Sequence, residues 1–230
     1  MPNNPESFPI VFTPDNEPYL GRISVYHFDQ IISACLQKNE DIASYTHTHE
    51  LNELQKAASQ IIPHGINLAL SIRELVRQGY LFSAVVLMRS LIERCAAISY
   101  LHENPEKVKL WHSGWKYGER PSLLKMLASM NKEADMDHAQ QVCDIFNHAV
   151  HGDPIGATFN LINIDDHGLG YAVGKALSEP ELCDFICFQS YCYLIVLTGR
   201  MSACFPETSE VKKHHSRKQR QRDTPNKSNE

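Results

Sequence analysis

The sequence lacks the residue patterns typical of a metal centre or a disulfide framework. Its seven cysteines are an odd number and form no CxxC pair, whereas a disulfide framework normally uses an even number. Most of them stand on apolar faces of expected helices, where a thiol packs as a small hydrophobe. His47 and His49 are equally isolated, and no HExxH-type motif occurs. We therefore expect neither a bound metal nor a cofactor.

Segments that would direct the chain to a membrane are also lacking. The first residues carry no basic region followed by an apolar run, so the sequence predicts no signal peptide. The two longest apolar stretches, 80–101 and 182–204, are interrupted by charged side chains such as Arg89 and Asp184. Such groups are costly at the centre of a bilayer. We expect a cytoplasmic protein that does not associate with membranes.

No internal repeat divides the 230 residues, and 43% of them are apolar, which suffices for one sizeable core. Residues 1–21 are rich in proline and have no amphipathic period, so they predict an extended N-terminal arm. Residues 206–230 have too few apolar side chains to offset the entropy of ordering and predict a disordered tail. A single helical domain is expected between them, at 22–205.

Helical periodicity dominates this predicted domain. The expected helices cover residues 23–39, 48–78, 80–103, 105–111, 121–127, 137–151 and 180–204. Pro63 is expected to kink or split the second helix, and Gly79 to end it. Residues 157–174 predict either a short β-hairpin or a packed loop. Six or more helices with short connections predict an all-α bundle.

The helix expected at 80–103 is apolar almost all round, which is typical of a central, mostly buried helix. Ser83, Ser90 and Arg94 form only a narrow polar strip along it. The residues expected to be almost fully buried are Leu87, Met88, Leu91, Ile92 and Cys95.

Arg89 and Glu93 form a first polar cluster, one turn apart on that helix and outside its polar strip. Charges among apolar residues need partners, because an unpaired buried charge is costly. One interpretation is therefore an ion pair that fixes helix packing. The other is a site in which Arg89 offers its guanidinium to a phosphate while Glu93 holds it in place.

A second polar cluster stands on the helix expected at 137–151. Asp144, Asn147, His148 and His151 recur at i, i+3, i+4 and i+7, so they share one side of the helix. The two histidines lack a third ligand, and zinc is not indicated. Histidine can act as an acid or base on a ribose hydroxyl, and Asn147 could orient His151. The alternative is a solvated polar stripe.

The C-terminal tail is strongly basic, although the whole chain has a net charge of −5. Six basic residues and no acidic one lie between 212 and 222: Lys212, Lys213, Arg217, Lys218, Arg220 and Arg222. Such a segment can bind the phosphates of RNA or DNA. The tail has no aromatic residue to stack on bases, and it equally fits a merely solvated tail.

Several of these segments together resemble the HEPN-like superfamily, in particular its bacterial helical members of unknown function. They are Arg89-Ser-Leu-Ile-Glu93, Tyr100-Leu-His-Glu-Asn-Pro105, Trp111 and Phe146-Asn-His-Ala-Val-His-Gly-Asp-Pro154. The resemblance implies an α-helical bundle that forms a homodimer. For many members it also implies a metal-independent ribonuclease of a toxin–antitoxin, CRISPR or phage-defence system. RNA and an antitoxin or another defence-system protein would then be the partners.

The family's catalytic motif is an arginine, usually followed by a polar residue, and then a histidine. His151 matches the histidine and Asn147 the polar residue, but Phe146 stands at the arginine position and cannot stabilise negative charge. Two hypotheses follow. In a ribonuclease, Arg89 would supply the missing charge from the neighbouring helix, and the catalytic candidates are His151, Asn147, Arg89, Glu93 and His148. Otherwise the chain is a non-catalytic helical module for dimerisation or ligand binding.

Overall fold

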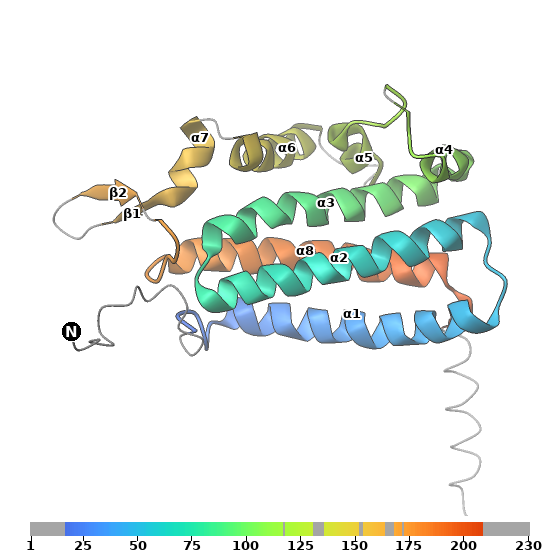
Figure 1. Ribbon diagram of the computed structural model, residues 1–230, viewed down its shortest axis with the longest axis horizontal. Coiled ribbons are helices and arrows are strands. Elements are labelled where there is room, and N and C mark those ends of the chain that lie inside the picture. The colour runs from blue at the N-terminus through green and yellow to red at the C-terminus, as the bar shows by residue number, and fades with distance from the viewer. Residues whose placement is uncertain are drawn as a thin grey trace, which may run out of the picture.

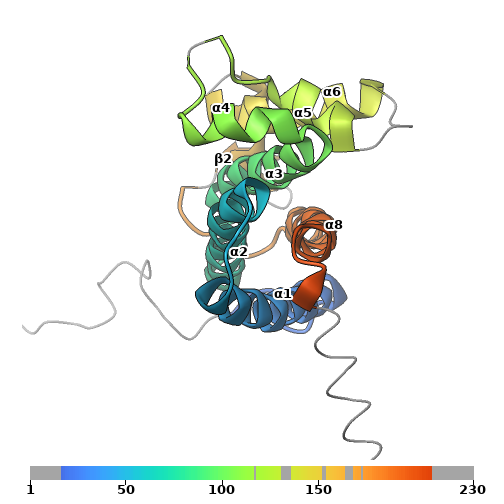
Figure 2. The same ribbon diagram turned by 90° about the vertical axis from the view of Figure 1, so that its right-hand side faces the viewer.

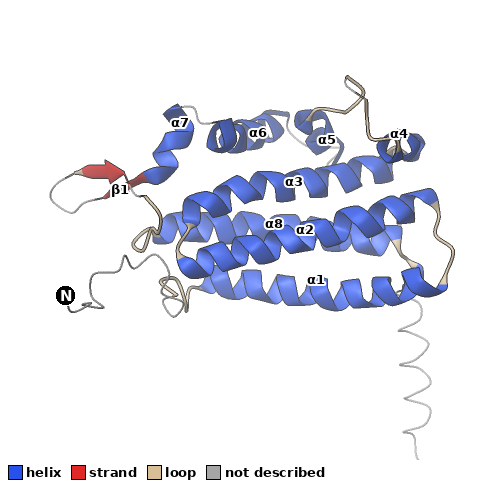
Figure 3. Ribbon diagram, in the orientation of Figure 1, coloured by secondary structure: helices blue, strands red, loops and turns tan. Residues whose placement is uncertain are grey.

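The computed structural model describes residues 17–116, 118–130, 136–151, 154–163, 168–171 and 173–208. The described chain is an all-α bundle with one short β-hairpin at its edge, as the helical periodicity predicts (Figure 3). Residues 1–16 of the expected arm and residues 209–230 of the expected tail lie outside the described part.

Four long helices form the body of the bundle. They are α1 (Ile23–Thr48), α2 (Glu53–Gln78), α3 (Leu81–Glu103) and α8 (Pro180–Cys204). Helix α1 packs against α8 and α2, and α3 packs against α2 and α8. The four helices run side by side in Figure 1 and surround a common core in the end-on view of Figure 2.

Helix α3 contributes heavily to the buried core, as expected from its apolar composition. Met88, Leu91, Ile92 and Cys95 are fully buried. The expectation for Leu87 was wrong, because this side chain is only half-buried and packs against the core from its edge. All seven cysteines are free and six of them are buried, which fits their predicted packing role.

The boundary between the first two helices differs from the expected one. Helix α1 continues to Thr48, and α2 begins only after Asn52. The Asn52 side chain accepts a hydrogen bond from the Gln55 backbone N–H at 2.9 Å, and the Gln55 side chain accepts one from the Asn52 N–H at 3.1 Å. This capping box satisfies two backbone donors at the start of α2 and so fixes where the helix begins.

Helix α2 is one continuous helix across Pro63, so the expected split at this residue is absent. The helix ends at Gln78, directly before Gly79, as expected. Gly79 has φ of 82°, a left-handed conformation that favours glycine, and its N–H reaches the carbonyls of Leu75 and Val76.

A second layer crosses the outer side of α3 (Figures 1 and 2). It comprises η3 (Pro105–Lys107), α4 (Val108–His112), α5 (Leu123–Met130) and α6 (Met136–His151). Helices α5 and α6 pack on α3, while α4 contacts α2. The layer therefore covers α3 and leaves residues of α2, α3 and the α4–α5 connection facing one another.

The chain then passes through α7 (Pro154–Ala157) and η4 (Thr158–Asn160) into the hairpin. Strands β1 (Leu161–Asn163) and β2 (Leu169–Tyr171) pair antiparallel, with Leu161 opposite Tyr171. Of the two alternatives for residues 157–174, the hairpin is the one observed.

Helix α8 is the one helix in the described part that is long and apolar enough, by length and composition, to cross a membrane. The core helix of a helical bundle can have the same composition. Helix α8 packs against α1, α2 and α3. Near its start, Asp184 accepts hydrogen bonds from Arg22 and Ser24. These contacts give α8 the position of a core helix in this bundle.

Candidate functional site

The two polar clusters expected from the sequence meet where α6 crosses α3. Arg89 and Glu93 lie on α3, and their side chains are only 17% and 23% exposed. Arg89 Nη1 is 2.8 Å from Glu93 Oε1, and Arg89 Nε donates a hydrogen bond to Asn147 Oδ1 of α6 at 3.2 Å. Nη1 makes no directed hydrogen bond, so its contact with Glu93 is a charge pairing. Arg89 is thus held from two sides.

The apolar face of α6 places Asn147 beside Arg89. Phe146 is fully buried, and its ring stacks on Phe185 of α8 with the centroids 6.2 Å apart. Adjacent residues on a helix point in different directions, and the next side chain, Asn147, reaches Arg89 of α3. The residue at the expected motif-arginine position is therefore a core residue.

The two histidines of the α6 cluster differ in exposure. His148 is half-buried, and His151, the last residue of α6, is exposed. Within the described part of the chain, no hydrogen bond or ion pair joins His151 to Arg89, Glu93 or Asn147. The structure thus joins three of the expected site residues and leaves His151 at the surface. The six basic tail residues lie outside the described residues.

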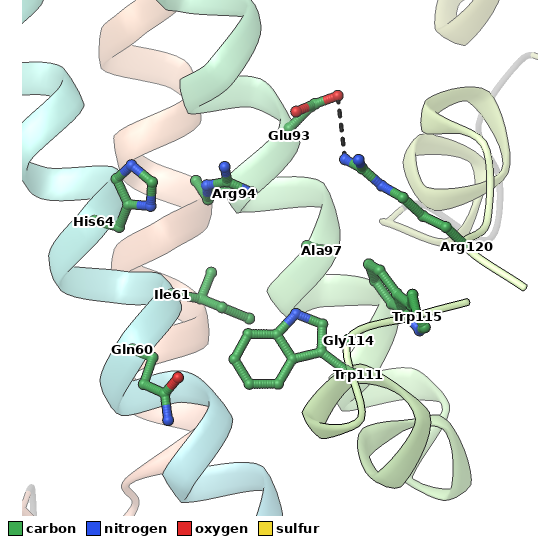
Figure 4. A pocket seen from close by; sticks show the side chains of 10 residues that line it. All are labelled: Gln60, Ile61, His64, Glu93, Arg94, Ala97, Trp111, Gly114, Trp115 and Arg120. Atoms are coloured by element: carbon green, nitrogen blue, oxygen red, sulfur yellow. Dashed lines mark ion pairs between the residues drawn. The ribbon is translucent and has the colours of Figure 1, made fainter. Parts of the chain in front are cut away.

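A cleft of about 530 Å³ opens beside the Arg89–Glu93 pair (Figure 4). It lies between α2, α3 and the segment from α4 to the start of α5. Its lining residues are Gln60, Ile61, His64, Glu93, Arg94, Ala97, Trp111, Gly114, Trp115 and Arg120. Glu93 belongs to both features, because it pairs with Arg89 and also lines the cleft. In the cleft, Arg120 Nη2 lies 3.4 Å from Glu93 Oε1. The cleft and the polar cluster are therefore continuous.

One wall of the cleft comes from α2 and α3. Gln60 and His64 are exposed residues one turn apart on α2, and Arg94 faces them from α3. The sequence places Arg94 on the polar strip of α3, and the structure shows that this part of the strip faces the cleft. Arg94 Nε is buried and has no hydrogen-bond acceptor.

Two tryptophans form the opposite wall. Helix α4 ends in a turn in which the Gly114 N–H donates to the Trp111 carbonyl at 2.9 Å and the Trp115 N–H donates to the Leu110 carbonyl at 3.1 Å. Gly114 has φ of 85°, and Trp115 has φ of 29°. Side-chain-bearing residues rarely adopt a positive φ, which costs about 1–3 kcal/mol. This turn sets both indoles against the cleft.

The side chains in the cleft are suited to binding a ligand. Arg94, Arg120 and His64 can donate hydrogen bonds to an anion, and two indole rings offer flat apolar surfaces. The Glu93 carboxylate is already paired with Arg89 and Arg120. Among the described residues, no group of three His, Cys, Asp or Glu side chains gathers as metal ligands do.

Comparisons of the chain with protein-family models, with curated proteins and with solved structures found no match. The resemblance to the HEPN-like superfamily therefore stays a prediction, and function has to be proposed from the site itself.

Proposed function

We propose that this protein is a non-catalytic helical binding module, with its ligand site in the cleft between α2, α3 and the α4–α5 connection. The observation that carries the proposal is the engaged state of Arg89. Glu93 and Asn147 hold its guanidinium at two nitrogens, so it is not free to bind a scissile phosphate. The neighbouring cleft contains cationic and aromatic side chains with room for a ligand.

The placement of His151 supports the same proposal. A general base has to lie within hydrogen-bonding reach of the proton that it removes and has to be held in position. His151 is exposed at the last residue of α6 and does not line the cleft. A catalytic role would require Arg89 to leave both of its partners.

Expression of the wild type beside His151→Ala tests this proposal. Growth and the integrity of total RNA are followed together, and purified protein is incubated with labelled single-stranded RNA. We expect intact RNA and equal growth for both chains. RNA cleavage by the wild type that is lost in His151→Ala would refute the proposal.

A metal-independent ribonuclease of a toxin or phage-defence system is the second candidate. The contact between Arg89 and Asn147 favours this candidate. In a ribonuclease Arg89 would stabilise the negative charge and Asn147 would orient His151, and the contact joins these two side chains between α3 and α6. RNA, a second copy of the chain and an antitoxin would then be the partners. In that case Arg89→Lys should also impair cleavage, because an ammonium group cannot replace the planar fork of donors.

A further inference from the structure

Arg94 has no anionic partner within the described part of the chain. The other described arginines each pair with a carboxylate: Arg22, Arg73, Arg77, Arg89, Arg120 and Arg200. The buried Nε of Arg94 also has no acceptor. A partly buried charge without a counter-charge is costly, and Arg94 lines the cleft. Its guanidinium therefore suits an oxyanion that enters there.

The charges around Arg94 favour an anion. Of the described residues that line the cleft, Glu93 alone is acidic, and Arg89 and Arg120 lie 2.8 Å and 3.4 Å from its carboxylate. Arg94 and the nearby His64 therefore face a site in which the negative charge is already neutralised. The N–H donors of a guanidinium match two oxygens of a carboxylate or a phosphate.

The opposite wall favours an aromatic ring. The chain has only two tryptophans, and both line this cleft. Trp115 is held there at a positive φ of 29°. Strain of this kind concentrates at functional sites such as ligand clamps. Flat indole faces bind other planar rings by offset stacking or edge contact.

The dimensions limit the ligand to a small molecule. A volume of about 530 Å³ lies within the usual range of small-molecule sites, roughly 300–1,000 Å³. Figure 4 shows His64 and Arg94 on the side of α2 and α3 and the two indoles on the side of α4 and the turn after it, so one compact ligand can contact both.

We infer that the cleft binds a small ligand with a planar aromatic ring and a single oxyanionic group, either a carboxylate or a phosphate. The ring lies against Trp111 and Trp115, and the oxyanion pairs with Arg94 near His64. This inference rests on the proposed function as a binding module and names the class of its ligand.

Calorimetric titration of the full chain with matched probes tests the inference. AMP is compared with adenosine, cinnamate with cinnamyl alcohol, and both anions with inorganic phosphate. At least one aromatic anion should bind about tenfold or more tightly than its uncharged counterpart and than phosphate, a difference of roughly 1.4 kcal/mol. Tight binding of AMP alone identifies a nucleotide-like ligand, and that of cinnamate alone an aromatic carboxylate. Equal binding of the charged and uncharged probes, or no binding of either anion, overturns the inference.

Two substitutions on exposed positions of α2 locate the site without a large effect on folding. His64→Glu adds a carboxylate that faces the cleft, whereas Asn67→Glu adds one a turn further along, outside the lining residues. His64→Glu should weaken binding of the aromatic anion about tenfold, since like charges in a partly desolvated site repel strongly. Asn67→Glu should change it by less than about threefold, because solvent and salt screen exposed charges. Equal losses in the two variants overturn the inference.

Arg94→Gln complements these variants by removing the proposed anchor. It should abolish the preference for the charged probe, with binding of the uncharged probe retained. His64→Glu keeps the test valid if Arg94→Gln does not fold. The two proposals fail in different ways. RNA cleavage by the wild type refutes the proposed function whatever the cleft binds, whereas a chain that cleaves no RNA and binds no aromatic anion refutes only the inference.

Discussion

Removal of the Glu93 carboxylate should destabilise the protein, because it leaves Arg89 without its counter-charge. The Arg89 and Glu93 side chains are 17% and 23% exposed, so the pair is mostly but not fully buried. Breaking a fully buried pair costs about 3–5 kcal/mol, and an exposed pair contributes about 0–1 kcal/mol. The hydrogen bond from Arg89 to Asn147 remains and offsets part of the loss. We expect Glu93→Ala to lower the free energy of unfolding by about 2–3 kcal/mol.

Urea denaturation at neutral pH measures this change. With a slope of about 3 kcal/mol per molar urea, the midpoint should fall by roughly 0.7–1 M. Glu74→Ala is the matched control, because Glu74 forms a similar pair with Arg77 on α2 but is 50% exposed. That control should lose less than about 1 kcal/mol.

A double-mutant cycle separates the pair from its surroundings. Arg89→Ala together with Glu93→Ala leaves no stranded charge, so the double variant should be less destabilised than the two single changes predict by about 1–2 kcal/mol. Strictly additive losses, or a Glu93→Ala variant as stable as the Glu74→Ala control, would refute the argument that Arg89 is held structurally.

Three further changes test the fold. Leu91→Ala in the buried face of α3 should cost about 2–5 kcal/mol in urea denaturation, whereas Leu36→Ala at an exposed position of α1 should cost less than about 1 kcal/mol. Asn52→Ala should lose about 0.5–2 kcal/mol by removing the cap of α2, and Asn52→Gly only a few tenths; equal losses would contradict the capping role. The hydrogen bonds that Arg22 donates lower the pKa of Asp184, so its carboxylate stabilises the fold above the unfolded-state pKa of about 3.9. Asp184→Asn should therefore lower stability by up to about 1 kcal/mol at neutral pH, given its partial exposure. In a pH series of melting temperatures this difference should disappear as the pH falls through the native pKa; a difference that persists in acid would contradict it.

The sequence predicts the helices best where apolar residues continue over many turns. Helix α8 begins and ends where expected, and α3 is buried along most of its length. The start of α2 was predicted too early, because apolar periodicity alone does not mark where a helix begins. Asn52 followed by Gln55 is the pattern of a capping box, and it marks the observed start. Helix α2 does not split at Pro63, because its packing against α1, α3 and α8 maintains the helix through this residue.

The site was only partly predictable, for a physical reason. Arg89, Glu93 and Asn147 stand out in the sequence because polar residues on otherwise apolar helices need partners. No comparable pattern in the sequence indicates the cleft. Its residues come from three separate segments, 60–64, 93–97 and 111–120, and no helical period connects them. The conformation of the turn at Gly114 and Trp115 decides where the indoles lie, and periodicity carries no information on that turn.

The emission of Trp111 and Trp115 tests the location of the ligand site most directly, because these are the only tryptophans in the chain and both line the cleft. The chain is titrated with whichever aromatic anion binds more tightly in calorimetry, and tryptophan fluorescence is followed. We expect a saturable change in emission whose midpoint gives the calorimetric dissociation constant, and a weakening of about tenfold in His64→Glu. Calorimetric binding that leaves the tryptophan emission unchanged would place the ligand elsewhere and contradict a site in the cleft.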